Sequence, residues 1–226
     1  MLSRTILRWK SNGHPYRILA VESNGYEQYF LKNNKSDKVE SFWKSFPPTS
    51  NDYVTVNGII EVPYSSLAKM ELKKDIKDHP HAQDFRRLNG TLVPRYYQMA
   101  TLFNYGYIPQ TWDSNHIGTF YQHGLTGDLD PIDIVELSNR PVLTRLPTEM
   151  VVIGALGLID QGELDWKILT LDLEEAKRLE VHSLTEALQR IPERLNYVRD
   201  FFRIYKTLEG KPENKYLEEA RYYTQD

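Results

Sequence analysis

Residues 127–135 read GDLDPIDIV, which places three carboxylates, Asp128, Asp130 and Asp133, within six residues and directly before an apolar run. In an extended chain Asp128 and Asp130 point to the same side. Pro131 prevents a regular ladder of strand hydrogen bonds, so the chain can turn and bring Asp133 back toward them. Two carboxylates about 4 Å apart repel by roughly 4 kcal/mol at an effective dielectric constant near 20. The cluster is therefore stable only if it is solvated, protonated or bound to cations.

The oxygen ligands of this cluster narrow the choice of cation. Hard oxygen ligands at this density suit magnesium, manganese or calcium. An EF-hand is excluded, because Asp133 stands where its loop requires a glycine and Asn139 replaces the closing glutamate. The alternative to a cation site is a solvated acidic turn, and other parts of the chain have to distinguish the two.

The composition is that of an ordinary globular chain, with 226 residues, 40% of them hydrophobic and 26% charged. This length predicts one domain with a core and some peripheral segments. The net charge of -3 lacks the basic surplus of nucleic-acid-binding proteins, so no nucleic-acid partner is expected. The absence of cysteine excludes disulfides, zinc–thiolate sites and cysteine nucleophiles. No apolar run approaches the roughly 18 residues that span a bilayer, so no membrane span is predicted.

Residues 1–11 carry basic side chains and no acid. Wound as a helix, they would place Leu2, Ile6 and Trp9 on one side and Arg4 and Arg8 on the other. This is the composition of a mitochondrial transit peptide, here over about residues 1–12. It predicts the mitochondrial matrix as the location. The alternatives are an ordinary basic tail and a cytoplasmic protein.

We divide the chain into an N-terminal extension, 1–53, whose part after the leader is peripheral, and a domain, 54–226. Short strands are expected within the extension at 17–21 and 26–31. In the domain, alternating or continuous apolar runs predict strands at 54–62, 69–72, 132–137, 151–159 and 165–171, with a weaker candidate at 91–97.

Beyond residue 172 the apolar period changes from two to about 3.6, which predicts helices. The expected helices cover 173–179, 183–191 and a final stretch that begins at Pro192 and ends before Gly210. Strands followed by helices predict an α+β fold, in which a small antiparallel barrel or curled sheet is flanked by C-terminal helices.

Short motifs with charged side chains are spread over the whole predicted domain. They are Glu61-Val62-Pro63, Ala68-Lys69-Met70-Glu71, Asn104-Tyr105-Gly106, Pro109-Gln110-Thr111-Trp112, residues 127–133, residues 160–167, residues 202–206 and residues 210–214. In combination they resemble those of the family I soluble inorganic pyrophosphatases in their eukaryotic form. The resemblance extends from about residue 54 to about residue 217.

The resemblance implies a five-stranded OB-like barrel whose open face holds three or four magnesium ions, with manganese as a substitute, around pyrophosphate. The implied reaction is hydrolysis to two phosphates. A water that bridges two divalent cations loses a proton near neutral pH. A carboxylate that is not fully committed to metal can accept that proton, and Asp130 matches this general base. The implied metal ligands are Glu71, Asp128, Asp133, Asp160 and Asp165.

Cationic and phenolic side chains match the family's contacts to pyrophosphate. Lys69 and Tyr105 match contacts to the attacked phosphoryl group, and Tyr205 and Lys206 match contacts to the leaving phosphate. Lys167 is expected close by, as a further substrate-binding residue. Glu61 and Glu163 resemble supporting acids that organise waters or backbone. Without the resemblance, Tyr205 would be a core residue of the last helix and Lys206 a cation at its C-terminus.

The chain departs from the family pattern in the 91–101 stretch. The family carries a phosphate-binding arginine there, and a tyrosine four residues before the Asn-Tyr-Gly tyrosine. Here Thr101 stands at the tyrosine position, and Arg95 reaches the site only if the strand register shifts. Gln161 replaces an acidic neighbour of Asp160, and Tyr64 replaces a basic residue.

Loss of one preorganised contact costs roughly 10²–10³ in rate, so these departures predict a slowed enzyme. The alternative is an inactive, pyrophosphatase-like subunit with a structural or binding role in a mitochondrial assembly. Hydrolysis of another phosphoanhydride is a minor option. The other expected partners are a second copy of this chain, in a homodimer, or mitochondrial partner proteins.

Overall fold

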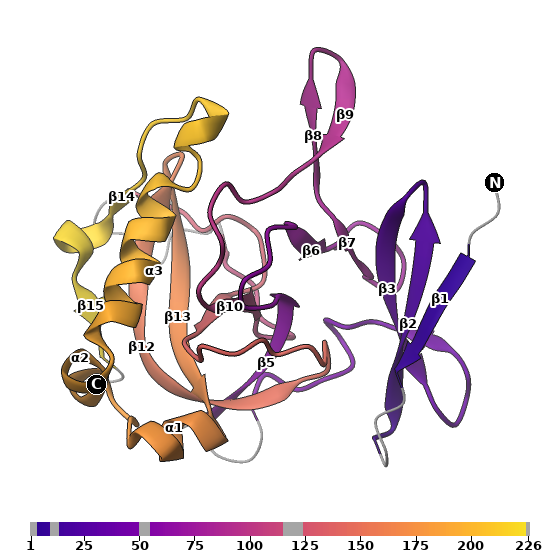
Figure 1. Cartoon of the computed structure of the whole chain (residues 1–226), viewed down its shortest axis with the longest axis horizontal. Helices are drawn as coiled ribbons and strands as arrows, with labels where there is room; N and C mark the ends of the chain where they lie inside the picture. The colour runs from indigo at the N-terminus through magenta and orange to yellow at the C-terminus, as the bar shows by residue number, and fades with distance from the viewer. Residues whose placement is uncertain (1–3, 10–13, 50–54, 115–123, 225–226) are drawn as a thin grey trace.

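The structure is a computed structural model that describes residues 4–9, 14–49, 55–114 and 124–224. It consists mostly of strands, with α-helices near the C-terminus, in agreement with the predicted α+β class. Figure 1 shows the N-terminal strands and the C-terminal helices on opposite sides of the molecule, with the strands of the predicted domain between them. None of the described helices has both the length and the apolar character needed to cross a membrane.

The larger sheet forms the centre of the molecule. Its order is β13-β11-β10-β5-β12-β14, with β15 paired to β12, and β12 also pairs β13. The pairings of β5, β10, β11, β13 and β12 therefore return to their starting point. The bounds are β5 (Thr55–Val62), β10 (Asn104–Tyr107), β11 (Asp133–Glu136), β12 (Thr148–Asp160), β13 (Glu163–Asp172), β14 (Lys215–Tyr216) and β15 (Tyr222–Tyr223).

Three local features shape this sheet. The long strand β12 has a register shift between Val152 and Gly154, as at a β-bulge. At Gly106 in β10 an added Cβ would lie 1.9 Å from the Ile59 carbonyl oxygen, so only glycine permits this close approach to β5. The turn between β12 and β13 uses Gln161 and Gly162 at positive φ, as a two-residue hairpin requires.

The smaller sheet joins the N-terminal segment to the predicted domain. Its order is β1-β2-β3-β7-β6, with β4 paired to β3. Leu31 and Phe42 of the N-terminal segment belong to the same buried cluster as Ile59 and Tyr107. Its strands are β1 (Arg4–Trp9), β2 (Tyr16–Ser23), β3 (Tyr26–Asn33), β4 (Val39–Glu40), β6 (Met70–Leu72) and β7 (His81–Gln83).

The helix expected over residues 1–11 is wrong for Arg4–Trp9, which form β1 and pair with β2. A helix of this length is marginal in water by itself, whereas β2 offers its edge to a neighbouring strand. Residues 1–3 and 10–12 of the expected leader lie outside the described residues. The other N-terminal strands, β2 and β3, confirm the expected ones and extend beyond them.

The weak strand candidate at 91–97 is shorter than predicted. Only β9 (Thr91–Pro94) is a strand, and it pairs with β8 (Phe85–Leu88) in a hairpin that projects from the body in Figure 1. The hairpin turn contains Asn89 and Gly90, both at positive φ. An Asn-Gly turn between two apolar-containing runs is the sequence signal that the prediction overlooked.

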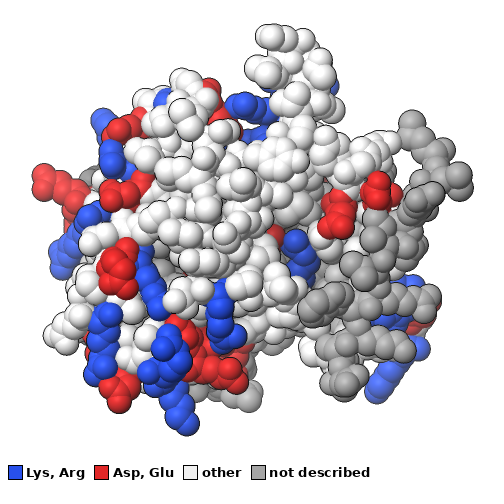
Figure 2. All heavy atoms as spheres, viewed as in Figure 1, with Lys and Arg blue, Asp and Glu red and all other residues white. Residues whose placement is uncertain are grey.

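The helices pack on the larger sheet, as the apolar period of about 3.6 residues predicts. They are α1 (Leu173–Leu179), α2 (Leu184–Arg190) and α3 (Pro192–Ile204), followed by the 3-10 turns η1 (Thr207–Glu209) and η2 (Leu217–Ala220). Asp172 and Ser183 cap α1 and α2 by accepting backbone N–H bonds. Gly210 closes η1 and not α3, which ends at Ile204. Figure 2 shows acidic and basic side chains interleaved over this C-terminal region.

Candidate active site

A cavity of about 460 Å³ lies between the two sheets and the end of α3. Its walls come from β5, β6, β10, β11, β12 and β13 and from the loop that precedes β11. The predicted site residues that line it are Glu61, Lys69, Glu71, Tyr105, Asp128, Asp130, Asp133, Asp160, Asp165, Tyr205 and Lys206. Lys167 lies behind this wall, and Glu163 is exposed at the β12–β13 turn away from it.

Lys167 joins the two carboxylates that the sheet brings together. The parallel register of β11 and β13 sets Asp133 beside Lys167. The Lys167 Nζ atom lies 2.5 Å from both Asp133 Oδ2 and Asp165 Oδ2, and its side chain is 1% exposed. Burial alone would lower the pKa of Lys167, but the two carboxylates raise it by more, so the pKa lies above its ordinary value. Tyr105 also donates its hydroxyl to Asp133.

Burial dominates the titration of the acids around Lys167. It raises the pKa of Asp165 well above its usual range, although Lys167 opposes the shift. Burial and the negative charge of Asp133 raise the pKa of Asp128 to about 6. Glu61 is also buried, and its pKa is raised by burial and by Asp133. Carboxyl groups, namely Glu61, Asp128, Asp133 and Asp165, therefore outnumber ammonium groups on this wall of the cavity, and burial favours their protonated forms.

Asp160, at the end of β12, faces the two residues that follow α3. Tyr205 donates its hydroxyl to Asp160 Oδ2 at 3.1 Å, and the Lys206 ammonium binds the same oxygen. The other oxygen, Asp160 Oδ1, is buried and has no hydrogen-bond partner among the described residues. A buried carboxylate oxygen without a partner is costly unless something binds it, so this atom fits a cation.

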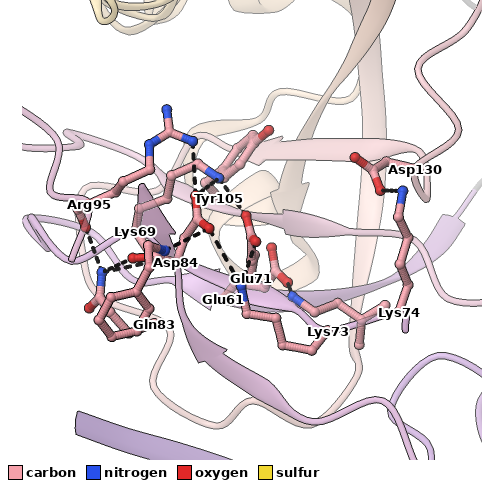
Figure 3. Close-up of polar contacts among 12 residues, drawn as sticks. Glu61, Lys69, Glu71, Lys73, Lys74, Gln83, Asp84, Arg95, Tyr105 and Asp130 are labelled. Atoms are coloured by element: carbon pink, nitrogen blue, oxygen red, sulfur yellow. Dashed lines mark hydrogen bonds and ion pairs between the residues drawn. The ribbon is translucent and has the colours of Figure 1, made fainter. Parts of the chain in front are cut away.

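A second group of charges surrounds Asp84 at the end of β7 (Figure 3). The Asp84 carboxylate lies 3.2 Å from Lys69 Nζ, 3.5 Å from Lys73 Nζ and 2.9 Å from Arg95 Nη1. Lys69 and Lys73 also bind the two oxygens of Glu71 at 2.6 and 2.7 Å. Burial acts to raise the pKa of Asp84, but Lys69 and its neighbours lower it well below its usual value.

Asp130 sits at the mouth of the cavity, and Figure 3 shows Lys74 reaching it from the end of β6. The Lys74 ammonium binds the Asp130 carboxylate and the Leu129 carbonyl oxygen. The Asp130 side chain is 53% exposed, which suits a group that exchanges protons with solvent. Its backbone N–H donates to Asp128 Oδ1 at 3.0 Å. Leu129 between them has a positive φ, so a turn joins these two acids and not the extended segment expected from the sequence.

Nothing in the described ranges forms a ready-made cluster of three His, Asp or Glu side chains that could hold a metal ion. Ammonium groups lie between the acids instead, with Lys167, Lys206, Lys74 and the Lys69–Lys73 pair each bound to at least one of them. The donor atoms nevertheless fit a hard divalent cation, because they are carboxylate oxygens in excess and one of them, Asp160 Oδ1, is unpaired.

The structure shows where the residues that depart from the family pattern lie. Thr101 is buried and donates its hydroxyl to backbone oxygens, so no phenol stands there. Tyr97 lines the cavity, and burial raises its pKa to about 12. Arg95 also lines the cavity, and its Nε is buried without a hydrogen-bond partner among the described residues. Gln161 is exposed in the β12–β13 turn.

The sequence prediction missed Lys73, Lys74, Asp84 and Tyr97. Lys73 had a usable signal, because Lys69, Glu71 and Lys73 alternate and share one face of an extended segment. Lys74 and Asp84 carry no such signal. Tyr97 lines the cavity because the chain after β9 passes alongside it. Short motifs do not encode that path.

Comparison with known proteins decides the family. Residues 58–224 match the inorganic pyrophosphatase family. The chain belongs to this family. It is 37% identical to soluble inorganic pyrophosphatase 6, chloroplastic, of Arabidopsis thaliana, over 87% of this chain and 63% of that protein. It is 31% identical to the mitochondrial inorganic pyrophosphatase of Saccharomyces cerevisiae, over 88% of this chain and 65% of that protein. The chain thus spans less than two thirds of either relative.

Solved inorganic pyrophosphatases have a similar structure. The type I enzyme of Toxoplasma gondii aligns with a TM-score of 0.83 and 27% identity, over 92% of this chain and 91% of that chain. The N-terminally truncated vacuolar soluble pyrophosphatase of Trypanosoma cruzi, in complex with PPi, aligns with a TM-score of 0.79 and 26% identity, over 100% of this chain and 90% of that chain. The likeness therefore includes the N-terminal strands as well as the residues of the family match.

Proposed function

We propose that this pyrophosphatase family member hydrolyses inorganic pyrophosphate to two phosphates with divalent cations, as a magnesium-dependent inorganic diphosphatase. The observation that carries the proposal is that carboxylates and cations from separated parts of the sequence line one cavity. Family membership supports the same reaction. The alternative of an inactive binding subunit is not favoured by these findings.

The implied metal ligands are Glu71, Asp128, Asp133, Asp160 and Asp165, with three or four magnesium ions as the expected number and manganese as a substitute. When bound, these ions would supply a water of lowered pKa and would neutralise charge on the phosphates. The unpaired Asp160 Oδ1 and the excess of buried carboxylates support this assignment.

Asp130 is the proposed general base. It lies at the open mouth of the cavity, where its half-exposed carboxylate can take a proton from the attacking water and pass it to solvent. Its partner Lys74 also lines the cavity. We assign no metal to Asp130, because a carboxylate that is bound to a divalent metal ion is a poor proton acceptor.

The cations of the cavity neutralise and position pyrophosphate, which is the larger part of the work in phosphoryl transfer. Lys69 and Tyr105 are proposed to contact the attacked phosphoryl group, and Tyr205 and Lys206 the leaving phosphate. Lys167 holds Asp133 and Asp165 in place behind them. Glu61 accepts the Leu72 N–H and is proposed to hold β6 against β5. Glu163 is proposed only as a turn residue, since it lies outside the cavity.

Arg95 is proposed to supply the phosphate contact for which the family pattern carries an arginine at another position of the same stretch. Its guanidinium lines the cavity, and its Nε donor is buried without a partner among the described residues. Arg95 binds Asp84 at 2.9 Å and Glu209 at 3.3 Å, and these two acids orient it without using all of its donors.

Two broader expectations accompany the function. We propose that the circuit of β5, β10, β11, β13 and β12 is the five-stranded OB-like barrel. A mitochondrial matrix location is supported by the basic N-terminus and by the mitochondrial yeast relative. A homodimer or mitochondrial partner proteins remain proposals, as does the division at residues 53 and 54.

The deciding assay is phosphate release from pyrophosphate in magnesium, measured for the wild type and for Asp130→Asn. The substitution keeps the shape and removes the proton acceptor, so we expect a loss of roughly 10²–10⁴ in kcat. Equal rates for the two proteins would refute the role of Asp130. Absence of phosphate release by the wild type would refute the proposed function.

A further inference from the structure

Glu71 carries an ammonium group on each of its two carboxylate oxygens. Lys69 Nζ lies 2.6 Å from Oε2, and Lys73 Nζ lies 2.7 Å from Oε1. Figure 3 shows the two lysines on either side of Glu71. Lys69 has an expected role in binding the attacked phosphoryl group. Lys73 has none, although it also lines the cavity.

This pairing conflicts with the proposed role of Glu71 as a metal ligand. A divalent ion at Glu71 would need at least one of the two oxygens, and the ammonium group already there carries charge of the same sign. One lysine must therefore move when the ion arrives. Both lysines are held by Asp84 as well, at 3.2 Å from Lys69 and 3.5 Å from Lys73, so neither leaves Glu71 without an alternative partner.

The surroundings of the two lysines identify the one that can move. Lys73 lines a second cavity, of about 490 Å³, on the side of β7 toward the β2–β3 hairpin. Its walls include Glu27, Gln28 and Asp84, which offer polar oxygens. Lys73 thus has space and acceptors away from Glu71, whereas Lys69 is not among the residues of that second cavity.

We propose that Lys73 is a resident counter-cation of Glu71 that competes with the divalent ion at this ligand. It raises the magnesium concentration at which a metal ion binds to Glu71. Lys73 is a positioning residue in this account, because it acts through Glu71 and does not touch the reacting atoms. The inference rests on the proposed function, since it assumes that Glu71 receives a metal ion.

The test compares wild type with Lys73→Met, which keeps the side-chain length and removes the charge. Lys73→Arg retains the charge, and Lys77→Met is the matched control, since Lys77 is an exposed lysine on the same loop. Two quantities are measured: the magnesium concentration for half-maximal hydrolysis at saturating pyrophosphate, and the affinity for Mn²⁺ by calorimetry in the presence of imidodiphosphate, which is not hydrolysed.

We expect Lys73→Met to need at least threefold less magnesium and to bind Mn²⁺ at least threefold more tightly. Lys73→Arg and Lys77→Met should behave like the wild type. Unchanged or weaker Mn²⁺ binding by Lys73→Met would overturn the proposal. A raised KM for pyrophosphate with unchanged metal affinity would overturn it as well, because Lys73 would then be a substrate contact.

The two measurements separate failure of this inference from failure of the proposed function. If the wild type releases no phosphate, the proposed function fails, while the calorimetric comparison still decides whether Lys73 opposes metal binding. If the wild type turns over pyrophosphate and the variants do not differ in Mn²⁺ affinity, only the inference fails. Lys73→Gln provides a second neutral variant if the Met variant folds poorly.

Discussion

Several acids of the cavity are paired with ammonium groups. Lys167 is the clearest case, since a 1% exposed lysine is acceptable only because Asp133 and Asp165 lie 2.5 Å away. The same holds at Asp160 with Lys206 and at Glu71 with Lys69 and Lys73. The proposed reaction requires these pairs to separate. The carboxylate oxygens then bind divalent cations, and the ammonium groups bind phosphate.

At the scale of single residues, Arg95 gives a testable prediction. Replacement by alanine should lower kcat/KM for pyrophosphate by roughly 10²–10³, because one preorganised contact to developing charge is lost. Arg95→Lys should recover part of the loss, since it restores a point charge without the planar fork. Steady-state kinetics in saturating magnesium measures both.

Arg87→Ala is the matched control for Arg95→Ala. Arg87 lies on the projecting β8–β9 hairpin and bonds the Gly90 carbonyl oxygen at 3.3 Å. Its loss should leave kcat/KM within a factor of two of wild type. If Arg95→Ala also retains wild-type kinetics, Arg95 serves only to join Asp84 and Glu209, and the cavity lacks the proposed contact.

At the scale of elements, the short strands β6 and β7 connect the N-terminal segment to the site. β3 pairs with β7 and β7 with β6, which carries Glu71. Behind this junction His81 is fully buried, stacked on Phe42 at 4.1 Å and bonded to the Tyr107 hydroxyl at 2.8 Å. The N-terminal segment therefore supports the strand that presents Glu71.

His81 makes the stability of this junction dependent on pH. Burial and, less strongly, Arg145 hold the pKa of His81 well below its ordinary value of 6.5. As pH falls through 6.5 the unfolded chain binds a proton that the folded chain does not bind. The folded state therefore loses stability on acidification, by about 1.4 kcal/mol per pH unit for this one group, and the contribution vanishes above pH 6.5.

The measurement is urea unfolding between pH 7.5 and about pH 5.5, compared with the double variant His81→Phe, Tyr107→Phe. The second substitution removes the hydroxyl that would otherwise be left unpaired. The difference in unfolding free energy between the two proteins should shift in favour of the variant as pH falls. A difference that is independent of pH would show that His81 does not titrate on unfolding.

Some elements could be predicted from sequence and others not, for physical reasons. Strands β5, β12 and β13 and the three helices have strong apolar periods, so local pattern and tertiary packing agree. Residues 4–9 read as an amphipathic helix but form β1, because pairing with β2 overrides a weak local preference. Strand β10 is short and was not predicted, since its sequence NYGY has no period long enough to measure.

The same distinction applies within the site. The acids near β11 and the β12–β13 hairpin follow from short motifs, since a turn or a two-residue alternation decides where they point. The position of Arg95 depends on the length of the β8–β9 hairpin, and that of Asp84 on the pairing of β7 with β6. These depend on contacts between distant segments, which one sequence does not reveal.

On the scale of the whole molecule, the cavity lies where the two sheets and the end of α3 meet. Figure 1 shows these parts arranged around the centre, with the smaller sheet on one side and the helices on the other. Glu71 comes from the smaller sheet, Asp133, Asp160 and Asp165 from the larger one, and Lys206 from the end of α3. Binding of metal and pyrophosphate should therefore tie the parts together and stabilise the folded chain.

The central claim is that the ammonium-bound carboxylates of this cavity become the metal site. Anomalous diffraction at the manganese edge, from crystals of the protein with Mn²⁺ and imidodiphosphate, tests it most directly. The account predicts manganese inside the cavity, bound by carboxylates of the proposed set Glu71, Asp128, Asp133, Asp160 and Asp165, with the Lys206 ammonium moved from Asp160 to the phosphate. Manganese bound only outside the cavity, with Lys206 still on Asp160, would contradict it.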